Sequence, residues 1–120
     1  MSMTKTLCRD VRKGLYAQVF PAVAAGAVFE VTFPRGVNRV LITSEVGVPW
    51  GWSVSEAGTA VDPPTQGQLA ANMVSGTGIV TTNLTAIIEI QHGARSWKFR
   101  NLGAAASNPT IEGHIIGADN

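Results

Sequence analysis

The side chains that could support acid–base or metal chemistry are few and widely spaced in this sequence. Nucleophilic catalysis needs a nucleophile, a base and an orienting group that converge, yet the only histidines are His92 and His114. Neither has a partner at the spacing of a metal ligand. We interpret both histidines as structural, and the single Cys8, which cannot form an intramolecular disulfide, as a small hydrophobe.

The carboxylates are equally dispersed. Paired carboxylates would suggest glycoside hydrolysis, but the glutamates stand singly on polar strand faces or in turns, at positions 30, 45, 56, 89 and 112. Gly76-Thr77-Gly78 lacks the Lys-Ser/Thr that follows in a phosphate-binding loop and reads as a turn. The sequence therefore predicts no catalytic residues, no metal, no cofactor and a protein that is not an enzyme.

One candidate partner-binding site is a pair of tryptophans. Trp50 and Trp52 flank Gly51, so the two indoles share one face of a predicted strand. Such a face could stack on a sugar ring. Tryptophan also supplies core or subunit-interface mass in small sandwiches, and we favour this second interpretation.

The second candidate is a basic N-terminal segment. Residues 1–13 hold four basic residues against one acidic residue, a net charge of +3, and the rest of the chain sums to −2. The basic residues, predicted to bind a partner, are Lys5, Arg9, Arg12 and Lys13. Four charges give nucleic acid only a weak, salt-sensitive contact, and no aromatic residues are interleaved with them, so no specific nucleic acid is predicted.

Composition points to a domain that packs against neighbours. Charged residues make up 14% of the 120 residues, against roughly 25% in an average soluble domain, and Val40 to Ala94 contain no Lys or Arg. A surface with so few charges is expected to be covered in part by other subunits. No apolar run is long enough to span a bilayer, and residues 1–14 lack the apolar core of a signal peptide. We therefore expect no membrane partner and synthesis in a cytoplasm.

Short β-branched and aromatic runs recur about every ten residues between Gly, Pro, Asn and Asp, as in sandwiches and barrels. The predicted strands cover 15–20, 28–33, 39–44, 50–54, 79–91, 96–102 and 110–116, and residues 55–78 are a long loop. Trp97 and Phe99 are predicted to face the core. The last two strands are predicted to form a hairpin that sets Arg100 opposite Glu112.

The predicted fold class is all-β, an antiparallel β-sandwich or jelly-roll-like barrel of about seven or eight strands with a short N-terminal arm. Residues 15–120 form one domain in this interpretation, and residues 1–14 form a basic arm, because no core strand begins before Leu15. The arm is expected to be ordered only in an assembly.

The basic arm, the neutral body rich in Ala, Gly and Thr, and the lack of catalytic groups together resemble the small virion proteins of tailed bacteriophages, most of all capsid decoration (cement) proteins. The resemblance spans the 120 residues and has no diagnostic motif, since neither Phe29–Phe33 nor Trp50-Gly51-Trp52 is a family signature. It implies a β-sandwich on the capsid surface of a virion, often a homotrimer, that bridges subunits of the major capsid protein or contacts other virion proteins.

Two alternatives remain open at this point. The chain could be a carbohydrate-binding β-sandwich of a phage tail or adhesin that uses Trp50 and Trp52. It could also be a tail or head-completion protein.

Overall fold

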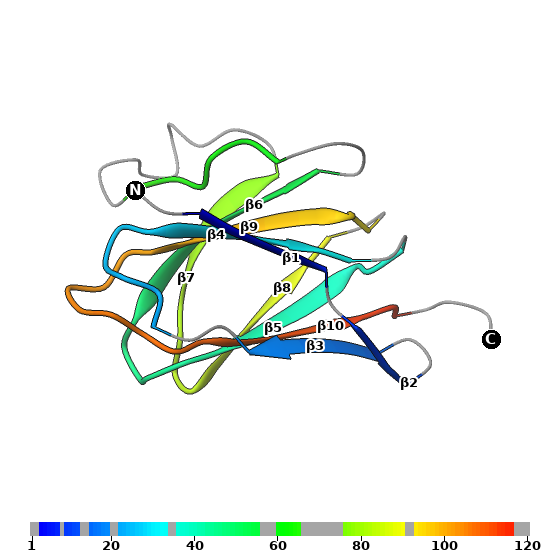
Figure 1. The fold of residues 1–120 in the computed structure, drawn as a ribbon, viewed down its shortest axis with the longest axis horizontal. Coiled ribbons are helices and arrows are strands. Elements are labelled where there is room, and N and C mark those ends of the chain that lie inside the picture. Colours follow the sequence, from blue (N-terminus) through cyan, green and yellow to red (C-terminus); the bar gives the residue numbers. More distant parts are fainter. Residues whose placement is uncertain are drawn as a thin grey trace.

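The structure is a computed structural model, and it describes residues 3–7, 9–12, 15–19, 22–33, 36–55, 60–65, 76–90 and 93–116. Within these ranges the strands build two five-stranded sheets that pack face to face (Figure 1). Sheet A has the order β1-β4-β9-β6-β7, from β1 (Met3–Leu7), β4 (Val28–Thr32), β9 (Ser96–Asn101), β6 (Pro49–Ser55) and β7 (Thr77–Thr81). Sheet B has the order β2-β3-β10-β5-β8, from β2 (Arg9–Arg12), β3 (Leu15–Val19), β10 (Thr110–His114), β5 (Arg39–Thr43) and β8 (Thr85–Glu89).

The predicted all-β sandwich is confirmed, and each predicted run contains a strand. The run 79–91 differs in detail, because a turn at residues 82–84 divides it into β7 of one sheet and β8 of the other. Leu84 occupies this turn with a φ of 79° and is 61% exposed. Unbroken alternation through 79–91 would set Leu84 on the same face as Ile88, but of the two only Ile88 is buried.

The N-terminal segment is where the fold departs most from the prediction. The expectation that no core strand begins before Leu15 is wrong, because β1 pairs with β4 and β2 pairs with β3. The β1–β4 pairing is parallel, so the sheets are not wholly antiparallel as predicted. A strand edge with unpaired backbone groups can accept a polar segment of weak strand pattern, which explains why β1 and β2 join the sheets.

The predicted hairpin between the last two strands is also wrong. β9 lies between β4 and β6 in sheet A, and β10 lies between β3 and β5 in sheet B. Arg100 is consequently opposite Val28 and Gly51, and Glu112 is opposite Leu41 and Ala17. The connection between β9 and β10 therefore crosses from one sheet to the other. A central position suits β9, because a strand with large aromatic residues buries the most apolar area when it has a neighbour on each side.

The core lies between the sheets and is dominated by aromatic rings from sheet A. Phe29 stacks on Phe99 with ring centroids 5.4 Å apart, and Trp97 meets Phe33 edge to face at 6.4 Å. The indole N–H of Trp97 donates to the backbone carbonyl of Ala94 at 3.1 Å. Sheet B contributes buried aliphatic side chains from three strands, namely Val40, Ile42, Ile88 and Ile111. The prediction that Trp97 and Phe99 face the core is confirmed.

Trp97→Ala should lower the free energy of unfolding by about 3–5 kcal/mol, because a fully buried indole is replaced by a cavity. Urea denaturation would measure the loss from the midpoint at a constant m-value. As a control, Val61→Ala removes a side chain that is 59% exposed and should cost under about 0.5 kcal/mol. Equal losses for the two variants would contradict the assignment of the core.

Candidate functional site

The tryptophan pair belongs to the core face of β6. Trp50 is fully buried, lies edge to face with Phe29, and donates its indole N–H to Ser44 Oγ at 3.0 Å. Trp52 is half-buried against the same core, with its indole over Gly78, where a Cβ would come within 2.6 Å of the ring. Trp50 is therefore a core residue and presents no ring to a sugar, and Trp52 packs against the core with part of its ring exposed.

The basic residues predicted to bind a partner fall on edge strands. Lys5 lies in β1, and Arg9 and Arg12 lie in β2, at the outer edges of the two sheets. Lys13 is outside the described residues, as are Cys8 and His92. The structure thus spreads the described basic positions over two sheets rather than along one extended arm.

His114 has a partner on its own strand. Its Nε2 atom lies 2.7 Å from Glu112 Oε2 on the outer face of β10. Among the described residues there is no cluster of three or more His, Cys, Asp or Glu side chains that could hold a metal ion. The Glu112–His114 contact is therefore a pair on a strand surface rather than part of a larger constellation.

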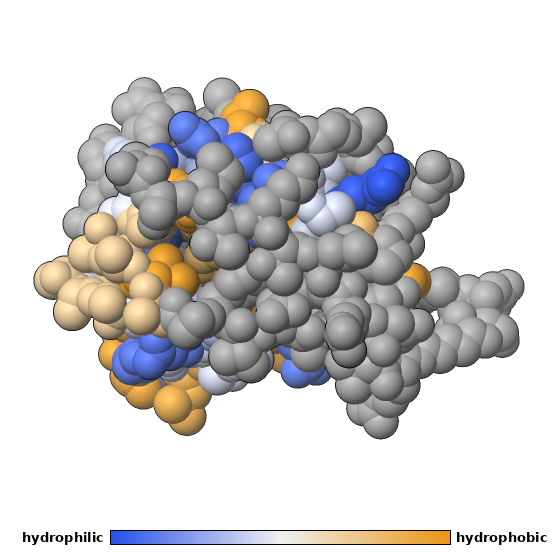
Figure 2. Space-filling model, in the orientation of Figure 1, coloured by the Kyte–Doolittle hydropathy of each residue, from blue (hydrophilic) through white to orange (hydrophobic). Residues whose placement is uncertain are grey.

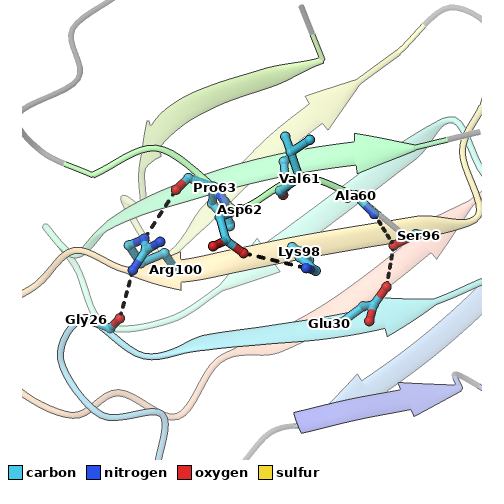
Figure 3. Close-up of polar contacts among 10 residues, drawn as sticks. Gly26, Glu30, Ala60, Val61, Asp62, Pro63, Ser96, Lys98 and Arg100 are labelled. Carbon is cyan, nitrogen blue, oxygen red and sulfur yellow. Dashed lines mark hydrogen bonds and ion pairs between the residues drawn. The ribbon is translucent and has the colours of Figure 1, made fainter. Parts of the chain in front are cut away.

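The outer face of sheet A carries a covered layer of polar side chains (Figure 3). Glu30, Ser53, Ser96 and Lys98 alternate with the core residues on β4, β6 and β9, and each is at most 6% exposed. They are covered by residues 60–65, which we call the covering segment and which run across the sheet in Figure 3. Charged groups are costly to bury without partners, so this layer must be held by specific contacts.

Those contacts join the covering segment to the sheet along its whole length. The Ala60 N–H donates to Ser96 Oγ at 3.1 Å, and Ser96 Oγ donates to Glu30 Oε2 at 2.5 Å. Lys98 Nζ lies 3.6 Å from Asp62 Oδ1. At the other end of the segment, Arg100 Nε donates to the Pro63 carbonyl at 3.3 Å.

Two further contacts close this layer. Ser53 Oγ donates to the Val61 carbonyl, and Arg100 Nη1 donates to the Gly26 carbonyl at 3.2 Å. No fully buried side-chain nitrogen or oxygen atom among the described residues lacks a hydrogen-bond partner. The arrangement neutralises and fills the outer face of sheet A, so its role is to attach the covering segment.

The covering segment approaches the sheet most closely at Gly51. A Cβ at this position would lie 2.4 Å from the Pro64 carbonyl oxygen, which is a backbone atom with little freedom to move. Gly51→Ala should therefore lift the covering segment and cost about 1–3 kcal/mol. Urea denaturation and limited proteolysis would detect both effects.

Val61→Ala is the matched control for this prediction, because Val61 belongs to the same segment and is 59% exposed. It should leave the proteolysis pattern unchanged. If Gly51→Ala is as stable and as resistant to protease as the wild type, the described contact between segment and sheet is wrong.

A second feature is an almost uncharged surface at one end of the sandwich. Four connections meet there, residues 22–27, 44–48, 82–84 and 102–109, and we call them the loop end. They contain one charged residue, Glu45. Figure 2 shows pale and deep orange atoms gathered at the left, where Figure 1 places these connections.

Backbone hydrogen bonds hold the four connections together. Val23 and Ser107 exchange a reciprocal pair at 2.7 and 3.0 Å, and the Gly47 N–H donates to the Thr82 carbonyl at 2.7 Å. The Thr82 hydroxyl contacts Ser44 Oγ at 3.0 Å, so the same group of bonds reaches the buried Trp50 indole. The loop end is thus a defined surface attached to the core.

A buried amide completes the loop end. Asn101 is fully buried and donates from Nδ2 to the carbonyls of Val23 and Ala105, at 2.9 and 3.0 Å. Its Oδ1 accepts the Gly103 N–H at 2.8 Å. The sequence contains no signal for Asn101 or Ser107, because a single Asn or Ser forms no pattern until the strands that surround it are known.

The only charge of the loop end is held by a hydrogen bond. Ser107 Oγ donates to Glu45 Oε1, and this bond, with support from backbone N–H groups, holds the pKa of Glu45 below its ordinary value. A lowered folded-state pKa means that the stabilisation is present above the unfolded-state pKa and is lost as the pH falls through the folded-state pKa. The carboxylate is therefore the form that joins 44–48 to 102–109 at neutral pH.

Ser107→Ala should raise the pKa of Glu45 toward its ordinary value, because the hydroxyl that stabilises the carboxylate is removed. An NMR titration of the Glu45 side-chain carboxyl would measure the change. Ser107→Thr keeps a hydroxyl and should retain the low pKa. An unchanged titration midpoint in Ser107→Ala would contradict the assigned contact.

Comparisons with known proteins identify no family for this chain. No family model matches the chain, and no curated protein matches it. Among solved structures, a de novo designed double-stranded β-helix aligns with a TM-score of 0.48 and 16% identity, over 82% of this chain and 97% of that chain. The likeness is one of fold alone.

Two natural proteins align at similar levels. PliG of Aeromonas hydrophila, a periplasmic inhibitor of g-type lysozyme, has a TM-score of 0.48 and 6% identity, over 94% of this chain and 98% of that chain. The cupin domain of Schizosaccharomyces pombe Cnp3 has a TM-score of 0.47 and 13% identity, over 89% of this chain and 57% of that chain. The described part of the chain contains no helix that is long and apolar enough to cross a membrane.

Proposed function

We propose that this chain is a non-enzymatic structural protein of a virus particle, a capsid decoration protein that contacts neighbouring subunits through the loop end. The observation that carries the proposal is the concentration of uncharged, mostly small residues on four connections of one end. The charge pattern of the sequence and its resemblance to phage cement proteins support the same function.

The chemistry of the loop end suits contact with protein. Ala104, Ala105 and Ala106 are exposed and small, so a neighbouring surface can approach the backbone closely. Val46 and Leu84 are 63% and 61% exposed and supply apolar side chains to bury. Depletion of charged residues is the compositional mark of the centre of a protein interface, and little desolvation cost opposes association here.

The proposed partners are the major capsid protein or other virion proteins, with further copies of this chain as neighbours in a homo-oligomer. The proposed location is the capsid surface, after synthesis in the host cytoplasm. A tail or head-completion role would use the same surface and differs in the identity of the partner. The carbohydrate-binding alternative has no support from the tryptophans, since Trp50 is fully buried and Trp52 packs against the core.

Val46→Lys should weaken attachment to virus shells, because a charge would have to be desolvated at the centre of the contact. The experiment is co-sedimentation of the full-length chain with shells of the encoding phage that lack this protein. We expect wild-type protein to pellet with the shells, and the variant to bind about tenfold more weakly, which corresponds to about 1.4 kcal/mol. Deletion of residues 1–13 is unsuitable for this test, since it removes two paired strands.

Ile116→Lys is the matched control for this experiment. Ile116 is an exposed aliphatic residue that follows β10 at the opposite end of the sandwich. The control should pellet like the wild type. Wild-type protein that fails to pellet with any virion component would overturn the virion assignment, and equal losses for both variants would overturn the assignment of the loop end.

A further inference from the structure

The two open sides of the sandwich differ in charge. β1 and β2 form the outer edges at one side, and β7 and β8 form them at the other, since each pair is joined by a short connection. The β1/β2 side contains Lys5, Arg9, Asp10 and Arg12. From Thr77 to Ile88 the β7/β8 side contains no charged residue. Natural proteins place charges on sheet edges to block pairing with other chains, and on this side Glu89, at the end of β8, is the single charged residue of the two strands.

The backbone direction in β8 shows which groups face outward. The Ser44 N–H donates to the Leu84 carbonyl, and the Ile90 N–H donates to the Asn38 carbonyl, at 3.0 and 2.9 Å. Hydrogen-bonded pairs alternate along an antiparallel ladder. Because the pairs Ser44–Leu84 and Asn38–Ile90 are bonded, the even-numbered residues of β8 are the ones that bond to β5 in this register. The N–H and C=O groups of Thr85, Ile87 and Glu89 therefore point away from β5, and no strand of the described residues pairs with them.

The side chains on this edge suit a second strand. Ile87 is 56% exposed and is opposite Leu41 of β5, which is half-buried. The one charge, Glu89, already has a partner, because Arg39 Nε and Nη2 both lie 2.8 Å from its Oε2 atom. Thr85 Oγ1 contacts Thr43 Oγ1 at 3.0 Å. The edge thus presents an apolar centre with polar ends that are already satisfied.

We propose that a second copy of this chain pairs with β8, antiparallel and centred on Ile87, so that the two copies share a continuous sheet across a two-fold axis. The outward N–H and C=O groups can form hydrogen bonds between the copies only if odd-numbered residues of one β8 lie opposite odd-numbered residues of the other. One register pairs all three of these residues. In it, Ile87 lies opposite Ile87 of the second copy, and Thr85 lies opposite Glu89 of the second copy. This proposal is independent of the virion function and of the loop end.

A second copy is the occupant that the charges favour. A two-fold contact requires a self-complementary edge, and in this register no two like charges are opposite each other. The β7 edge lies at the same side and is uncharged, so it adds no repulsion. The paired strands are short, so the area buried is small and we expect a dimer that forms with increasing concentration.

Two substitutions at Thr85 test the register. Thr85→Glu sets a carboxylate against Glu89 of the second copy at two symmetric places, and should raise the dimer dissociation constant about tenfold. Thr85→Lys sets an ammonium there and should leave the constant unchanged or lower it. Both variants lose the same contact with Thr43, so each controls for the other. Sedimentation equilibrium across a range of protein concentrations would measure the constants.

Ile87→Pro gives a second test, because it removes an N–H that points outward and leaves the bonds between β5 and β8 in place. Ile87→Thr keeps this N–H and is its control. The proline variant should be monomeric with an unchanged circular dichroism spectrum, and the threonine variant should still form dimers. Wild-type protein that is monomeric at every concentration, or trimeric, or equal effects of the two Thr85 substitutions, would each overturn the proposed pairing.

Discussion

Burial of the aromatic inner face of β9 is the constraint on which the rest of the structure depends. Trp97 and Phe99 have exposures of zero, and this requires a strand on each side of β9 and a sheet opposite it. β4 and β6 supply the flanks with their own aromatic residues, Phe29 and Trp50. The connection after β9 must then leave sheet A, and that crossing brings residues 102–109 to the loop end.

The alternation of a strand has a second consequence at β9. Each inward aromatic residue places a polar neighbour on the outer face, so Ser96, Lys98 and Arg100 form a polar row on sheet A. The covering segment satisfies this row through its backbone carbonyls, its Ala60 N–H and Asp62. Sheet A is thus covered on both faces at β4, β6 and β9, and the loop end and the strand edges are among the surfaces left open to partners.

The loop end and the β8 edge offer two different kinds of contact. The loop end presents side chains and small residues held by Asn101 and Ser107. The β8 edge presents unpaired backbone groups around Ile87. A protein that uses both could bind a partner surface through its end while it associates with another copy through its side. Neither contact requires chemistry at a reactive side chain.

The sequence by itself determined the all-β class, most strand positions and the inward faces of β4 and β9. Period-2 alternation is a local property, and burial of Phe29, Trp97 and Phe99 follows from it directly. Strand partners could not be predicted in this way, because many pairings satisfy the same alternation. Only the tertiary structure decided that β9 and β10 lie in different sheets, that β1 and β2 each add an edge strand, and that four distant connections form one end with Glu45 as its single charge. Each depends on which edges remain open after the core has been packed.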